Sequence, residues 1–158
     1  MAIQWRKEMS VDGSIIDEDH KALIDLVNAF EAIINQKPTM RALDQSLSRL
    51  MLYSVEHFKG EEELQRAVHY PFHQAHAREH YDLVKKLEAI IAHRGAAQSG
   101  YDITVVARET LELLKEWLVS HILHTDLRMR PYVAQMKPYR QSMTTLVEHN
   151  GGSRSSSA

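Results

Sequence analysis

Residues 57–80 read HFKGEEELQRAVHYPFHQAHAREH, and this stretch decides the fold that we predict. His57 and Glu61 are four positions apart, and so are His76 and His80. On an α-helix, side chains with this spacing lie on one face. The Tyr-Pro pair between them separates two helices, because the residue before a proline disfavours helical geometry. The stretch therefore predicts two consecutive helices, each with a pair of metal-competent side chains on one side.

Helical periodicity extends from this stretch in both directions. Apolar residues recur with i, i+3, i+4, i+7 spacing, which is typical of helices that pack on a shared core. The predicted segments run from about Asp17 to Gln36, Thr39 to Val68, Phe72 to Ala92 and Asp102 to Leu127. Each would span roughly 30 Å at 1.5 Å per residue. Helices of similar length with short connections predict an all-α fold, an antiparallel up-down-up-down four-helix bundle.

The ends of these segments carry helix signals. Asp17 is expected to cap the first helix and Thr39 the second, because such side chains accept hydrogen bonds from free backbone N–H groups. Pro38 and Pro131 are expected to stop the first and fourth helices just beyond their ends. The longest connection is a glycine-containing stretch over residues 94–100.

One helical domain is expected over residues 1–131. A chain of 158 residues can bury a core without needing a metal or a disulfide merely to fold. The helical pattern weakens in residues 132–150, which we interpret as a C-terminal extension. Residues 151–158, GGSRSSSA, have the composition of a flexible tail or linker.

The composition excludes several kinds of site and partner. The chain has no cysteine, which excludes disulfides, iron–sulfur clusters and thiolate zinc sites. Its formal net charge of −2 provides no basic field for nucleic acid or anionic membranes. The N-terminus lacks the apolar core of a signal peptide, and no run is long enough to span a membrane. We therefore expect a cytoplasmic protein without a nucleic-acid or membrane partner.

Ten histidines in one chain of this size require an explanation. The first predicted helix offers His20, and the fourth offers His121 and Asp126, in addition to the two pairs above. Ligands rich in nitrogen with two carboxylates suit iron, zinc, manganese or copper rather than calcium or magnesium. Five histidines and two carboxylates are too many for one ion, whereas two bridged ions use them all. Taken singly, each of these residues is more often an ordinary core or surface group.

The spacing leaves the choice of ligands open at two places. His73 lies three positions before His76 and could share its face, and His124 could replace Asp126. The separation of five between His121 and Asp126 turns an ideal helix by about 140°. We therefore hypothesise a π-bulge between these two residues, a feature that is frequent at functional sites.

In this order the motifs resemble the hemerythrin family, specifically its bacterial branch, over roughly residues 1–131. The matching pieces are Trp5, Met-Ser-Val at 9–11, IDEDHKALIDLVN at 16–28, HFKGEEEL at 57–64, Tyr-Pro at 70–71, HQAHAREH at 73–80 and WLVSHILHTD at 117–126. The resemblance implies two Fe ions bridged by two carboxylates and an oxo or hydroxo group, with one coordination position open for dioxygen. The implied ligands are His76, His80 and His121 on one iron, His20 and His57 on the other, and Glu61 and Asp126 as bridges.

The resemblance also implies a dry apolar pocket for dioxygen. Leu118, one helical turn before His121, is our main candidate for its lining, with Trp117 and Phe58 as weaker ones. Glu18 and Asp19 are candidates for hydrogen bonds to ligand histidines, although acidic residues at a helix start are commonly solvated.

Two residues depart from the family pattern. Met129 stands where a tyrosine often follows the bridging aspartate, which could change the floor of the pocket. His124 places a polar ring between His121 and Asp126 and could act as a proton donor near the site. His69, His93 and His149 are assigned to the surface.

The function expected from the resemblance is reversible dioxygen binding for oxygen carriage, storage or sensing. One alternative is an oxygen- or redox-sensing domain of a larger signalling protein, with a signalling domain or redox partner. Another is a di-iron oxidase or peroxidase, although such enzymes rely on Glu-x-x-His pairs that the proposed ligands lack. A zinc-binding or structural bundle is the third.

Overall fold

The computed structural model describes residues 2–36, 38–95 and 103–135. Within these ranges every regular element is a helix and no strand occurs, which confirms the predicted all-α class. The elements are η1 (Lys7–Met9), α1 (Ile15–Ile34), α2 (Met40–Ala67), α3 (His73–Gly95), α4 (Ile103–His124), η2 (Asp126–Met129) and α5 (Arg130–Ala134).

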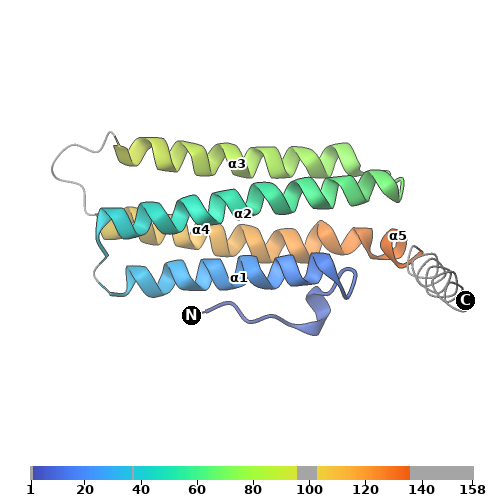
Figure 1. Cartoon of the computed structure of the whole chain (residues 1–158), viewed down its shortest axis with the longest axis horizontal. Coiled ribbons are helices and arrows are strands. Elements are labelled where there is room, and N and C mark those ends of the chain that lie inside the picture. The colour runs from blue at the N-terminus through green and yellow to red at the C-terminus, as the bar shows by residue number, and fades with distance from the viewer. Residues whose placement is uncertain (1, 37, 96–102, 136–158) are drawn as a thin grey trace, which may run out of the picture.

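The four long helices lie side by side with alternating direction (Figure 1). α1 packs on α2 and on α4, and α2 packs on α3, as expected for an up-down-up-down bundle. One end of the bundle brings together the start of α1, the turn between α2 and α3, and the short helix α5 (Figure 1). None of the described helices combines the length and apolarity needed to cross a bilayer.

Each long helix buries a stripe of apolar side chains in a common core. Phe30 of α1 and Leu43 of α2 are completely buried, and Leu87 of α3 and Leu114 of α4 are nearly so. Complete burial of such side chains contributes about 1.5–3 kcal/mol each. A smaller apolar cluster closes the end of the bundle that carries α5; it consists of Val11, Ile16, Tyr70, Met129 and Val133.

The start of α1 differs from the prediction, because Asp17 is not its N-cap. The helix begins at Ile15, with Ser14 in the capping position. The carboxylate of Asp12 accepts hydrogen bonds from the backbone N–H of Ser14 at 2.8 Å and of Asp17 at 3.2 Å. The Asp17 carboxylate instead accepts from the backbone N–H of Val11 at 2.7 Å. Asp12 thus satisfies the first turn, and Asp17 anchors the loop that precedes it.

The two ends of α2 agree with the prediction. Thr39 Oγ1 accepts a hydrogen bond from the backbone N–H of Ala42 at 3.2 Å, which confirms Thr39 as its cap. Beyond the C-terminus, exposed His69 has a positive φ of 52°, so the chain reverses through a left-handed residue. The backbone N–H of Tyr70 then donates to the carbonyl of Gln65 at 2.9 Å, which ties the turn to α2.

The end of α4 corrects three expectations. The helix ends at His124 rather than near Leu127, and residues 126–129 form the 3-10 turn η2, so there is no π-bulge between His121 and Asp126. Thr125, with φ −113° and ψ −58°, links the end of α4 to η2. Pro131 does not close α4; it lies in the first turn of α5, where a missing N–H is harmless.

Part of the C-terminal extension predicted over 132–150, all of the tail at 151–158 and most of the connection at 94–100 lie outside the described residues. The same holds for His149 and for the side chain of His93.

Candidate metal centre

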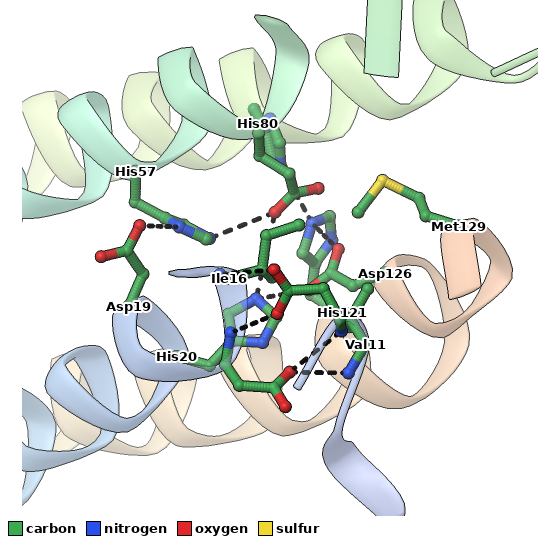
Figure 2. A network of polar contacts seen from close by, with 12 residues as sticks. Val11, Ile16, Asp19, His20, His57, His80, His121, Asp126 and Met129 are labelled. Carbon is green, nitrogen blue, oxygen red and sulfur yellow. Dashed lines mark hydrogen bonds and ion pairs between the residues drawn. The ribbon is translucent and has the colours of Figure 1, made fainter. Parts of the chain in front are cut away.

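Seven metal-competent side chains from four helices and η2 come together inside the bundle. Figure 2 shows five of them, His20, His57, His80, His121 and Asp126, pointing toward one another. Each of the seven residues is at most 4 % exposed. They are the same seven residues that were proposed as ligands from the sequence, namely His20, His57, Glu61, His76, His80, His121 and Asp126.

The first group consists of His76, His80, His121 and Asp126, and one ligand atom from each lies within 4.8 Å of the others. Nε2 of His80 is 3.0 Å from Nε2 of His76 and 3.0 Å from Nε2 of His121. Asp126 Oδ1 is 3.0 Å from His121 Nε2. Three ring nitrogens and a carboxylate oxygen therefore face one point.

The second group consists of His20, His57 and Glu61, with ligand atoms that also lie within 4.8 Å of one another. His57 Nε2 is 3.2 Å from Glu61 Oε2. Each carboxylate also reaches across to the other group. Glu61 Oε1 is 2.8 Å from His76 Nε2, and Asp126 Oδ2 is 3.2 Å from His20 Nε2. The arrangement is that of two cation positions joined by two carboxylates.

The buried polar atoms of this cluster are not satisfied by the protein itself. Both ring nitrogens of His20, Oε2 of Glu61 and both carboxylate oxygens of Asp126 are buried without a hydrogen-bond partner among the described residues. Leaving such groups unpaired costs about 1–3 kcal/mol each. A neutral imidazole also carries only one N–H, so the three converging nitrogens include lone pairs that repel one another. Bound cations remove both costs, and the residues therefore fit two metal ions.

Without cations, the cluster balances its charge with protons. Burial opposes ionisation of Glu61, but contacts with His57 and His76 lower the pKa of Glu61 to about 2. Burial lowers the pKa of His76, yet its contacts with Asp126 and Glu61 outweigh this and raise that pKa to about 9. For His80 the burial dominates and lowers the pKa to about 3. The metal-free cluster thus pairs ionised carboxylates with protonated His76.

Carboxylates outside the cluster hold three of the histidine rings by the opposite nitrogen, Nδ1. His80 Nδ1 lies 3.0 Å from Glu62 Oε1, and His121 Nδ1 lies 3.1 Å from Glu79 Oε2. When the ring donates from Nδ1 to a carboxylate, Nε2 is left as a free lone pair directed at the cation. The three rings are therefore oriented for metal binding by residues of neighbouring turns and helices.

Asp19 belongs to the same set, whereas Glu18 does not. Asp19 Oδ2 is 3.4 Å from His57 Nδ1, and its Oδ1 accepts a hydrogen bond from the Tyr53 hydroxyl at 2.9 Å. Glu18 forms an exposed ion pair with Lys21. Sequence reasoning missed Glu62 and Glu79. The available signal was only that each is acidic and adjacent to a ligand, at positions 61 and 80.

At Nδ1 of His76, an amide takes the place of the carboxylate found at Nδ1 of His57, His80 and His121. Gln65 is completely buried, and its Nε2 lies 2.9 Å from His76 Nδ1 and 3.1 Å from Glu61 Oε1. The same amide nitrogen is 3.0 Å from the sulfur of Met129, and Gln65 Oε1 is 3.1 Å from His73 Nδ1. Met129 thus packs against a residue that touches the centre, and sequence reasoning did not single out Gln65.

The two residues that the spacing left open both lie outside the cluster. His73 contacts Gln65 rather than a cation position. His124 is exposed, and its Nδ1 lies 2.9 Å from the backbone carbonyl of Ser120, so its ring faces its own helix and is not a proton donor into the site. His69 is exposed, as expected.

Aromatic rings cover the cluster on the side of the bundle core. Phe58 stacks on His80 with a centroid distance of 3.9 Å, and Trp117 stacks on His121 at 4.6 Å. Leu118 is 3 % exposed and belongs to the core cluster that also contains Phe58. The histidine rings therefore face apolar packing on this side.

The family model described as hemerythrin HHE cation binding domain matches residues 12–133, a span that contains every residue of the cluster. The chain belongs to the hemerythrin family. It is 27 % identical over 148 residues to a bacteriohemerythrin of Stenotrophomonas maltophilia, covering 94 % of this chain and 89 % of the relative. It is 28 % identical over 127 residues to a myohemerythrin of Theromyzon tessulatum, covering 80 % of this chain and 90 % of the relative.

A solved crystal structure of a point mutant shows the same arrangement of helices. Its TM-score is 0.70 at 26 % sequence identity, and the match covers 84 % of this chain and 98 % of that one. Together with the bacteriohemerythrin names among the relatives, this places the chain beside the bacterial hemerythrins, as the sequence motifs predicted.

Proposed function

We propose that this hemerythrin-family chain binds dioxygen reversibly at a carboxylate-bridged di-iron centre, and that it serves oxygen carriage, storage or sensing. In this proposal the domain comprises residues 1–131. The proposed iron ligands are His76, His80 and His121 on one side, His20 and His57 on the other, and Glu61 and Asp126 between them, with a bridging oxo or hydroxo group.

The unequal number of histidines in the two groups is the observation that carries the proposal. Both carboxylates reach both groups, but three ring nitrogens belong to the first group and only two to the second. With equal sharing of the bridges, the position at His20 and His57 has one protein ligand fewer. An iron pair supplies the two electrons that dioxygen takes up on binding and gives back on release.

The protein's own contribution is to hold the ligand rings and to keep water away. Asp19, Glu62 and Glu79 fix the ring orientations through Nδ1, so little rearrangement accompanies metal binding. Phe58, Trp117 and Leu118 form an apolar side against His80 and His121, and they exclude water and protons from that side of the cluster.

The optical spectrum of the iron-loaded protein tests the proposal. The reduced protein under nitrogen is expected to be colourless, to gain a visible charge-transfer band in air, and to lose it again under vacuum. A band that forms once and never reverses would replace reversible binding with an oxidase or redox-sensing role. If no iron-dependent band formed in any state, the di-iron proposal would fail, and a zinc-binding or structural bundle would take its place.

A further inference from the structure

A pocket of about 610 Å³ opens beside the metal centre, between the start of α1, the second half of α2 and Val133 of α5. These elements lie at the same end of the bundle (Figure 1). His57 and Glu61 form part of the pocket wall. We name it the α1–α2 pocket. It leads from the surface to the proposed cation position that has the fewer histidines.

The charged residues that line the α1–α2 pocket are all acidic, apart from His57. They are Asp12, Asp19, Glu61 and Glu63, and no lysine or arginine among the residues that the structure describes lines the pocket. Three of these carboxylates differ in their exposure. Glu63 is exposed, the Asp19 side chain is 33 % exposed, and the Glu61 side chain is 0 % exposed. The carboxylates of the pocket wall therefore range from exposed to fully buried, and their negative charges give a field that favours cations.

At the buried end of the pocket wall, one carboxylate oxygen lies near a histidine nitrogen but makes no hydrogen bond of good geometry among the described residues. Glu61 Oε2 is buried without a hydrogen-bond partner, and it lies 3.2 Å from His57 Nε2. A buried carboxylate oxygen in this state is costly unless a cation or a donor reaches it. Glu61, the most buried carboxylate of the pocket wall, is thus one of the proposed bridging ligands.

A second pocket lies beside the opposite group, and its lining also has acidic residues but differs in one charge. It is lined by Glu79, Glu112 and Glu116, and also by Lys86, whose positive charge opposes cations. The ligand histidine on its wall, His121, is covered by the stacked ring of Trp117 and held at Nδ1 by Glu79. The charge and the packing both favour the α1–α2 pocket as the route.

Gly60 keeps the wall of the α1–α2 pocket open. It lies inside α2, where a glycine destabilises the helix by roughly 0.5–1 kcal/mol relative to alanine. No close packing among the described residues requires it, because a Cβ at this position would meet nothing within 4 Å. A larger side chain here would occupy the pocket rather than collide with the fold.

We propose that the α1–α2 pocket is the site where a divalent cation first binds from solution, and from which it passes along Asp19 to Glu61 to load the centre. The inference rests on the proposed metal centre, but it is independent of dioxygen binding. It assigns Glu63 and Asp19 a role in capture and makes Gly60 the residue that keeps the route free.

The rate of Co²⁺ uptake by metal-free protein, followed by stopped-flow absorbance of the bound ion, tests this route. Gly60→Leu is expected to slow uptake by about tenfold or more, because loading then requires a displacement of the wall. Gly60→Ala is the matched control for helix stiffness and should load at the wild-type rate. Glu63→Gln should slow uptake by about two- to tenfold at low salt, and this effect should vanish at high salt.

A second control tests whether cations enter through the other pocket. Ser120→Leu narrows the pocket beside His121 and is expected to leave the rate unchanged, since Ser120 is exposed and its side chain contacts His124, which is not a proposed ligand. Each variant is also refolded in the presence of Co²⁺ to show that it holds the wild-type number of ions. Gly60→Met provides the same plug if Gly60→Leu does not fold.

The outcomes distinguish failure of the proposed uptake route from failure of the proposed metal centre. Wild-type uptake rates in refoldable Gly60→Leu or Gly60→Met would overturn the route, and so would slow uptake confined to Ser120→Leu. If the wild-type protein bound no Co²⁺ even on refolding, the proposed metal centre itself would fall, and the route with it.

Discussion

The amide nitrogen of Gln65 lies 2.9 Å from Nδ1 of His76, at the position where the other clustered rings with an Nδ1 partner face a carboxylate. A carboxylate at Nδ1 accepts a hydrogen bond and raises the basicity of a ligating histidine, whereas an amide nitrogen only donates hydrogen bonds and has no such effect. His76 therefore differs electronically from His80 and His121, its partners in the same group. Gln65 also contacts Glu61 at 3.1 Å, so one buried residue touches a terminal ligand and a bridging ligand.

We predict that Gln65→Glu increases the affinity for Co²⁺ or Zn²⁺. The new carboxylate would accept from His76 Nδ1 and would repel Glu61 until a cation binds. Gln65→Leu should instead decrease the affinity by about 10–100-fold, the usual cost of losing such a partner. Competition with a chelator measures both constants. Equal affinities in the two variants would show that Gln65 only fills space.

Glu61→Gln is expected to abolish occupancy of at least one cation position. Glu61 reaches both groups, and its replacement leaves one negative charge fewer in a fully buried site. Elemental analysis of iron per chain measures the loss. Glu56→Gln, an exposed change on the same helix, is the matched control and should retain the wild-type content. Two irons per chain in Glu61→Gln would contradict its role as a bridge.

The metal-free protein is expected to lose stability as the pH rises from about 6.5 to about 9. The pKa of His76 is raised from 6.5 to about 9 in the folded state, so its contribution is complete below 6.5 and is lost as the pH passes 9. The pKa of His57 is also raised, despite its burial, by its contact with Glu61. One such group changes the unfolding free energy by at most about 1.4 kcal/mol per pH unit.

Thermal unfolding of metal-free and Zn²⁺-loaded protein across this pH range provides the measurement. The loaded protein should show little change between these pH values, because its histidines bind the ion in their neutral form. It should also unfold at a higher temperature, since a ligand that binds only the folded state stabilises it. A metal-free protein that gained stability towards pH 9 would exclude the charge balance described for His76 and Glu61.

Leu118→Ala is expected to shorten the lifetime of the oxygenated protein. The cavity should destabilise the fold by about 2–5 kcal/mol and should admit water beside the histidine rings. Leu111→Ala removes a similarly buried leucine earlier on α4 and is the matched control. Its stability should fall by a similar amount while the rate of irreversible oxidation stays unchanged. Equal oxidation rates for both variants would remove Leu118 from the proposed dioxygen pocket.

The sequence by itself determined the helical bundle and which residues were candidates for the metal centre. Periodicity sets which side chains share a face within one helix, so His57 with Glu61 and His76 with His80 were predictable as pairs. The sequence also predicted Thr39 as the cap of α2, because helix capping depends on residues within one turn. At Asp17 the same local argument went wrong, since Asp12 competed for the same backbone groups.

Only the tertiary structure decided how the pairs meet and what surrounds them. Intrahelical spacing carries no information about the axial register of one helix against another. The contacts of Glu79 with His121 and of Gln65 with His76 therefore had no local signal. The same reason applies to the α1–α2 pocket. The space beside Gly60 is empty because of how the neighbouring helices pack, and the sequence does not specify this packing. Asp126 reaches the centre because α4 ends before it, and that depends on the packing of η2 and α5.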